Sequence, residues 1–161
     1  MGDNFRDHVW SFENPTIRFK YCKVNSEIRP IPAKPKVENF IMATVLVIDD
    51  SSFQRKIIAG ILTENGYRVV LSENGKDGIE RLDKEQPDLI ISDLLMPEYD
   101  GYWVLNALKK TGRTIPIIIL TSDIQKTTVM RCRELGVFAF LNKPVEKNQL
   151  IEAVRKALIR S

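Results

Sequence analysis

The sequence predicts an α/β protein built on a doubly wound, five-stranded parallel sheet. Five short runs rich in Val, Ile and Leu alternate with segments whose apolar residues recur at helical spacing. Runs that are apolar on both sides are typical of parallel strands covered by helices on both faces. The whole alternation fits within residues 43–161, which is the length of one ordinary domain.

Each strand of this predicted domain is followed by a helix. A β-branched run at 44–48 predicts the first strand. Ser51 or Ser52 can cap the helix that follows, and Gly66 ends it. The apolar residues of this helix recur at helical spacing, at Ile57, Ile58, Ile61 and Leu62. The remaining strands are expected at 67–71, 88–92, 115–120 and 138–141. The remaining helices are expected at 76–84, 101–110, 126–135 and 146–159.

Residues 1–42 form a separate N-terminal extension by composition. Residues 16–24 alternate apolar and polar side chains, and a turn at Asn25-Ser26 followed by a short strand at 27–31 predicts a β-hairpin. The prolines and lysines of 30–36 are typical of an extended linker. Because an isolated hairpin is marginal in water, its apolar face is expected to pack on the larger domain or on a second copy as a homodimer; the alternative is a loose tail.

Charge and composition exclude several classes of protein. The net charge of +3, from 24 basic and 21 acidic residues, is too small and dispersed for a nucleic-acid footprint, so no direct DNA binding is expected. No apolar run approaches the roughly 20 residues of a membrane helix, and residues 1–10 have no apolar segment of a secretory signal. With one histidine and two cysteines that lie 110 positions apart, neither a zinc site nor a disulfide scaffold is expected. A cytoplasmic protein is expected.

Polar residues gather where the predicted strands end. Asp49 and Asp50 follow the first strand and Asp93 the third, while Thr121 with Ser122 follows the fourth and Lys143 the fifth. Ligands of open α/β sheets bind at this carboxyl edge. Oxygen ligands without His or Cys suit Mg²⁺, and carboxylates, Mg²⁺, a lysine and a hydroxyl are what a phosphoryl group needs. We therefore expect Asp93 to be phosphorylated, with Asp49 and Asp50 holding the metal.

Each of these residues also has an ordinary structural interpretation. An Asp pair after a strand commonly forms a turn or caps a helix, Thr121-Ser122 is typical of a helix N-terminus, and Lys143 could be a surface lysine. Their coincidence at one edge of one predicted sheet favours function.

The stretches VLVIDDSSFQRK (45–56), DLIISDLLMPEYDG (88–101), IIILTSD (117–123) and FAFLNKP (138–144) resemble the receiver domain of two-component response regulators. The match spans 43–161 in the family's order and is similar to single-domain, chemotaxis-type members. The resemblance implies a flavodoxin-like fold with strand order 2-1-3-4-5, an order described for that chemotaxis protein. In this order Asp50 and Asp93 face each other.

The resemblance also implies a role for each matching residue. A sensor histidine kinase or phosphotransfer protein would phosphorylate Asp93, and Mg²⁺ would be held by Asp49, Asp50, Asp93 and the backbone carbonyl of Leu95. The residues that would sense the phosphoryl group and switch binding of an unknown downstream protein are Thr121, Phe140 and Lys143. Residues two beyond Asp93 and Thr121, here Leu95 and Asp123, would tune self-dephosphorylation. Lys143-Pro144 matches a peptide bond that is often cis.

Two other functions stay open at this point. A phosphohydrolase of the aspartyl-phosphate kind would share the carboxylates, Mg²⁺ and lysine. Those enzymes resemble one another in an Asp-x-Asp after the first strand and need a substrate cap. Here the first loop is Asp49-Asp50-Ser51, and no insert is long enough for a cap. The other alternative is a constitutive interaction domain that is never phosphorylated. As a signalling domain the chain is expected not to be an enzyme beyond self-phosphorylation from small donors and slow self-dephosphorylation.

Overall fold

The computed structural model describes residues 10–11, 20–24, 27–30, 42–122 and 125–159. The chain divides into two compact units, Met1–Ile41 and Met42–Ser161, which are described separately below. Among the described residues no helix has both the length and the apolar character needed to cross a membrane.

The N-terminal unit contains a small antiparallel sheet of β1 (Trp10–Ser11), β2 (Lys20–Val24) and β3 (Glu27–Pro30), in that order. β2 pairs with β3 from Val24↔Glu27 to Tyr21↔Pro30, which confirms the predicted hairpin. Pro30 lies on a strand at the edge of this sheet, which is where proline is tolerated in sheets. β1 is an addition that the alternation pattern did not predict. The other residues of the predicted hairpin strands, at 16–19 and 31, and the predicted linker lie outside the described residues.

The larger unit is a five-stranded parallel sheet in the order β5-β4-β6-β7-β8, which is the expected order 2-1-3-4-5. The strands are β4 (Thr44–Ile48), β5 (Arg68–Ser72), β6 (Leu89–Asp93), β7 (Ile117–Thr121) and β8 (Ala139–Asn142). Every residue of β4, β6 and β7 is buried, because these strands have a neighbour on each side and helices on both faces.

Four of the strands begin and end slightly later in the chain than predicted. Each of them ends on a polar residue that follows its apolar run, namely Ser72, Asp93, Thr121 or Asn142. Apolar character marks where a strand is buried, whereas pairing with its neighbour decides where it ends; Thr121, for example, still pairs with Asn142. As a result Asp93 and Thr121 belong to the sheet itself and share its rigidity.

The helices are α1 (Ser52–Glu64), α2 (Gly75–Glu80), α3 (Leu82–Glu85), α4 (Gly101–Thr111), α5 (Lys126–Glu134) and α6 (Lys147–Ile159). Ser51 caps α1, as predicted. The single helix predicted at 76–84 is instead divided at Arg81 into α2 and α3. Arg81 keeps a helical backbone and its amide still bonds to the Asp77 carbonyl, so the division is a local irregularity in one helical segment.

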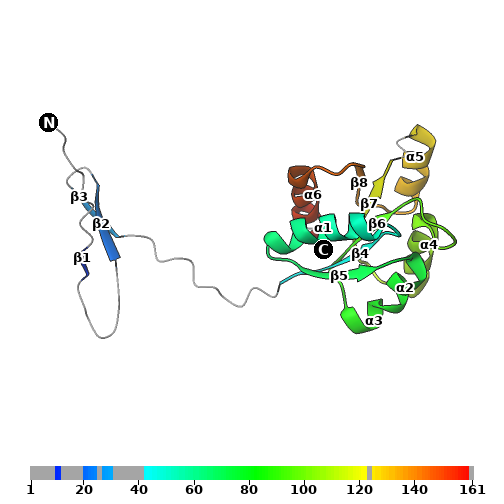
Figure 1. Cartoon of the computed structure of the whole chain (residues 1–161), viewed down its shortest axis with the longest axis horizontal. Helices are drawn as coiled ribbons and strands as arrows, with labels where there is room; N and C mark the ends of the chain where they lie inside the picture. The colour runs from blue at the N-terminus through cyan, green and yellow to red at the C-terminus, as the bar shows by residue number, and fades with distance from the viewer. Residues whose placement is uncertain (1–9, 12–19, 25–26, 31–41, 123–124, 160–161) are drawn as a thin grey trace. The chain divides into compact units, whose positions relative to one another are not determined.

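Helices cover both faces of the sheet (Figure 1). On one face Ile58 and Leu62 of α1 and Leu150 and Val154 of α6 pack against buried strand residues such as Val47. On the other face α3, α4 and α5 contribute to a second core with alternate strand residues. Side chains alternate between the faces of a strand, so each strand serves both cores. This three-layer packing leaves the carboxyl edge of the sheet as the place where polar side chains converge.

Candidate functional site

Asp49 follows β4 directly and is almost fully buried, with 1% of its surface exposed. Its amide continues the sheet ladder by donating to the Ser72 carbonyl at 3.2 Å. Its Oδ1 accepts a hydrogen bond from the Ser51 amide at 2.8 Å, while Oδ2 accepts one from Lys143 Nζ at 2.8 Å. Asp50, the next residue, is exposed. The two adjacent aspartates therefore have different surroundings, one inside the edge and one at its surface.

Asp93 is the last residue of β6 and has 6% of its surface exposed. Its Oδ2 lies 2.7 Å from Lys143 Nζ, and its Oδ1 accepts a hydrogen bond from the Leu95 amide at 3.2 Å. Lys143 thus bridges Asp49 and Asp93, which come from different strands of the sheet. A buried carboxylate needs such partners, because an unpaired buried charge is costly.

A backbone hydrogen bond holds the ends of β7 and β8 together at this edge of the sheet. Thr121 is the last residue of β7 and is buried, and its carbonyl accepts a hydrogen bond from the Lys143 amide at 3.0 Å. The following Lys143-Pro144 peptide bond is cis, as in the pattern that the sequence resembles. Phe140, on β8, is half-buried against the core that α4 and α5 cover. Thr121 and Lys143 are therefore held beside the aspartates by the sheet.

The charges at this edge change one another's proton affinity. Burial raises the pKa of the Asp93 carboxyl and the neighbouring Asp49 raises it further, while the Lys143 hydrogen bond opposes this change only in part. Burial alone would lower the pKa of Lys143, but its hydrogen bonds to Asp49 and Asp93 outweigh burial and leave that pKa above its ordinary value. Lys143 therefore stays charged at neutral pH and is the cation that this cluster needs.

The loop after β6 comes very close to the site. A Cβ at Gly101 would lie 2.7 Å from the Asp93 carbonyl oxygen and 2.8 Å from the Leu94 Cα, so only glycine fits there. A Cβ at Gly75, at the start of α2, would likewise lie 2.6 Å from the Tyr99 carbonyl oxygen. Glu98 has a left-handed backbone, with φ of 59°. These contacts set the path of the chain that leaves Asp93.

The donor set fits a hard divalent cation. Asp49, Asp50 and Asp93 each offer a carboxylate oxygen, and these oxygens lie within 4.8 Å of one another. Oxygen ligands around an edge that is partly open to water suit Mg²⁺, which keeps several of its own waters. Lys143 contributes one positive charge to the carboxylates of Asp49 and Asp93, which leaves the negative charge of three aspartates only partly balanced.

The other expected site residues are placed less tightly. Leu95 is 54% exposed, and its contact to the site is the amide hydrogen bond to Asp93. Asp123 lies outside the described residues. Sequence reasoning assigned no role to Arg55, whose Nη1 donates to the Asp49 carbonyl at 2.5 Å. No spacing rule relates a residue in a helix to a carbonyl six positions earlier, so only the folded chain could show this contact.

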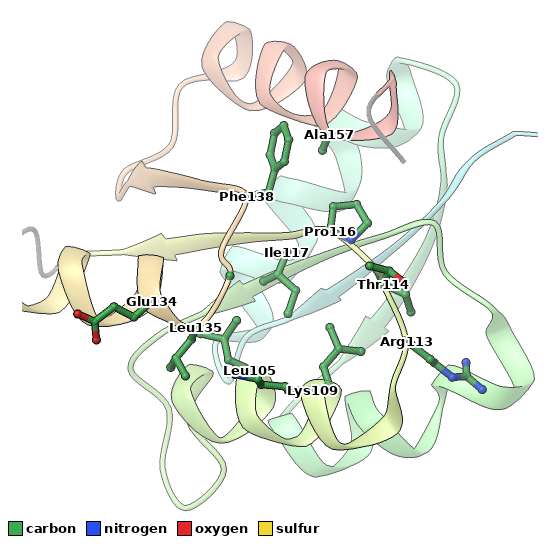
Figure 2. A pocket seen from close by; sticks show the side chains of 13 residues that line it. Leu105, Lys109, Arg113, Thr114, Pro116, Ile117, Glu134, Leu135, Phe138 and Ala157 are labelled. Carbon is green, nitrogen blue, oxygen red and sulfur yellow. The ribbon is translucent and has the colours of Figure 1, made fainter.

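A groove of about 530 Å³ lies at the opposite, amino edge of β7 (Figure 2). Its walls come from the end of α4, the start of β7, the end of α5 and the residues before β8, and include Leu105, Pro116, Ile117, Leu135 and Phe138. Most of these side chains are apolar, and the aspartates and lysine described above lie at the other end of the strands. The chemically equipped part of the molecule is therefore the carboxyl edge, not this groove.

Comparison with known proteins shows the family. Residues 45–155 match the response regulator receiver domain, and the chain belongs to this family. The chemotaxis protein CheY of Bacillus subtilis is 34% identical over 115 residues, covering 71% of this chain and 96% of that protein. A structure of the chemotaxis protein CheY4 of Vibrio cholerae superimposes with a TM-score of 0.70 at 28% identity, covering 73% of this chain and 99% of that chain.

Longer regulators match through the same part of the sequence. The transcriptional regulatory protein GlrR of Escherichia coli is 39% identical over 119 residues, covering 74% of this chain but only 27% of that protein. The chain thus spans about a quarter of the length of the first of its curated relatives. What the comparisons establish is a receiver domain of two-component signalling, in a family whose members generally bind Mg²⁺ at an acidic pocket and interact with histidine kinases or phosphotransfer proteins.

Proposed function

We propose that this chain accepts a phosphoryl group on Asp93 from the phosphohistidine of a sensor histidine kinase or phosphotransfer protein, and that the modified domain binds a downstream protein. The observation that supports this proposal best is Lys143 Nζ, which lies 2.7 Å from Asp93 Oδ2 and 2.8 Å from Asp49 Oδ2. It ties the acceptor carboxylate to a cation and to a second acid at one edge of the sheet. This geometry suits phosphoryl transfer better than a structural ion pair alone.

In the proposed reaction an oxygen of Asp93 attacks the phosphorus of the donor. A P–O bond forms to Asp93, the P–N bond of phosphohistidine breaks, and its electron pair stays on the imidazole nitrogen, which can take a proton from water. Lys143 holds the carboxylate beforehand and then pairs with the added negative charge. Hydrolysis of the resulting acyl phosphate returns the carboxylate and inorganic phosphate.

Asp49, Asp50, Asp93 and the Leu95 carbonyl are proposed to hold Mg²⁺. The ion would supply positive charge for the phosphoryl oxygens, which the three carboxylates would otherwise repel. The carboxylate oxygens of Asp49, Asp50 and Asp93 within 4.8 Å of one another support this assignment. Removal of Mg²⁺ with EDTA is expected to stop phosphorylation of the chain by a small donor.

Thr121, Phe140 and Lys143 are proposed to convert phosphorylation into partner binding. Thr121 and Lys143 are joined by a backbone hydrogen bond at the site, and Phe140 lies on the neighbouring strand β8. Leu95, more than half exposed, is proposed to shield the phosphorus from water, and Asp123 to act on the same water. Self-dephosphorylation would then be slow, and the domain would turn over no substrate other than its own phosphoryl group.

The test is incubation of the full chain with Mg²⁺ and acetyl phosphate, followed by intact-mass and peptide mass spectrometry. Wild type is expected to gain one phosphoryl group, located on Asp93, and Asp93→Asn to gain none. Asp83→Asn is a matched control, because Asp83 is an exposed aspartate on α3 that pairs with Arg113 away from the carboxyl edge. Phosphorylation of Asp93→Asn at the wild-type rate would contradict the proposal.

The cytoplasmic setting and a homodimer formed through residues 1–41 also belong to this proposal. Light scattering of the full chain and of a variant that lacks residues 1–41 tests the dimer. An unchanged subunit number after the deletion would remove it.

A further inference from the structure

Arg55 reaches back from the second turn of α1 to the loop that carries the first two aspartates. It is partly buried, and its Nη1 donates to the Asp49 carbonyl oxygen at 2.5 Å. Its own amide makes the first helical hydrogen bond, to the Ser51 carbonyl at 3.0 Å. Hydrogen bonds from a charged donor are roughly twice as strong as neutral ones. The guanidinium therefore ties the start of α1 to the end of β4.

This contact completes the fixation of Asp49. The Asp49 amide is held by Ser72, Oδ1 by Ser51 and Oδ2 by Lys143, so Arg55 engages the one remaining polar atom of the residue. Asp50, in contrast, is exposed. The peptide between the two residues is planar, so the Asp49 carbonyl and the Asp50 amide turn together. Holding that carbonyl fixes the point from which the Asp50 carboxylate extends.

We propose that Arg55 is a positioning residue for the metal-binding carboxylate of Asp50. It acts through the Asp49 carbonyl and touches neither the metal nor the phosphoryl group. The inference rests on the proposed function, since it concerns the Mg²⁺ that the three aspartates would hold. Residues that orient metal ligands in this way commonly contribute about 10- to 100-fold to metal affinity.

The direction of the change in Mg²⁺ affinity distinguishes a positioning role of Arg55 from a purely electrostatic one. A cation near a metal site repels Mg²⁺, so loss of the Arg55 charge alone would strengthen Mg²⁺ binding. Loss of the hydrogen bond to Asp49 would weaken it. Lys56, the next residue of α1, is exposed and carries the same charge, which makes it the matched control.

The experiment is a Mg²⁺ titration of the full chain, followed by the ¹H–¹⁵N amide shifts of Asp50 and Leu95, for wild type, Arg55→Gln, Arg55→Lys and Lys56→Gln. Arg55→Gln is expected to raise the half-saturating Mg²⁺ concentration about tenfold. Arg55→Lys keeps one donor and is expected to raise it less, and Lys56→Gln to leave it unchanged or lower it. The Mg²⁺ concentration for half-maximal phosphorylation by acetyl phosphate should rise in parallel, with the rate at saturating Mg²⁺ little changed.

Mg²⁺ binding by Arg55→Gln as tight as, or tighter than, that of wild type overturns the inference and leaves the proposed function standing. A wild type without saturable shifts at Asp50 overturns both. If Arg55→Gln loses the amide dispersion of a folded domain, Arg55→Lys decides: at least twofold weaker Mg²⁺ binding supports the role, and unchanged binding rejects it.

Discussion

The two edges of the parallel sheet are made from the same five strands but have different chemistry. At the carboxyl edge the buried Asp49 and Asp93 both pair with the partly buried Lys143, and Gly101 lets the chain pass close to Asp93. At the amino edge the start of β7 borders a groove of about 530 Å³ lined mostly by apolar side chains (Figure 2). The site therefore depends on the few residues that follow each strand and on how tightly they pack, because the same strands contribute to both edges.

The largest effect is expected where packing at the carboxyl edge is tightest. In Gly101→Ala the new methyl would meet backbone atoms of Asp93 and Leu94 at 2.7 and 2.8 Å, and backbone cannot move aside as a flexible side chain does. We expect a loss of about 2–3 kcal/mol in the free energy of unfolding, measured by urea denaturation, and slower phosphorylation.

Gly60→Ala is the control for this substitution. Gly60 lies within α1, and a Cβ there would meet nothing within 4 Å. Alanine in an open helical position is expected to stabilise the domain by about 0.5–1 kcal/mol. Equal effects of the two substitutions would show that close packing does not distinguish the carboxyl edge.

The next effect concerns charge. Lys143→Met leaves Asp49 and Asp93 buried without their shared cation, which is expected to cost about 3 kcal/mol in the free energy of unfolding at pH 7.5. The pKa of Asp93 is already raised by burial, and loss of Lys143 removes what opposes that rise. A raised folded-state pKa means that the folded chain binds the proton more tightly than the unfolded chain, so stability falls as the pH rises above the unfolded value.

The loss of stability in Lys143→Met is therefore expected to be largest at neutral pH. It should shrink as the pH is lowered toward the ordinary pKa of an aspartate, about 4. Urea denaturation at several pH values measures it. Lys147→Met removes an exposed lysine that pairs with Glu64, and it should leave stability nearly unchanged throughout. A loss of stability that does not depend on pH would argue against the buried carboxylate of Asp93 as its source.

The smallest effect is expected at two residues with a left-handed backbone conformation, one at each edge. Gln86, with φ of 45°, precedes β6 at the amino edge, and Glu98, with φ of 59°, lies in the loop after β6 at the carboxyl edge. Replacing either by glycine is expected to add about 0.5 kcal/mol to the free energy of unfolding, because glycine adopts this backbone without steric cost. Only Glu98→Gly should change the rate of phosphorylation. An equal change in Gln86→Gly would remove the distinction between the edges.

Much of the fold could be predicted because its signals are local. Runs such as 44–48 are apolar throughout since β4 is buried on both faces, and Ser51 before α1 is a cap with its acceptor in its own side chain. The paired strands β2 and β3 followed from alternation and a turn. The exact strand ends were missed, because they depend on pairing with neighbouring strands, as Thr121 pairs with Asn142. The division of the helix at Arg81 was also missed, and no local sequence signal marks it.

The sequence by itself determined which residues meet at the carboxyl edge. A parallel strand always ends at the same side of its sheet, so Asp49, Asp93, Thr121 and Lys143 had to converge once the strands were recognised. Only the tertiary structure decided that Asp49 is buried and its neighbour Asp50 exposed. It also decided that Lys143 bonds to both Asp49 and Asp93, and that Arg55 bonds to the Asp49 carbonyl. These contacts join residues from different elements, and their geometry depends on the register and packing of the whole sheet, which no local pattern encodes.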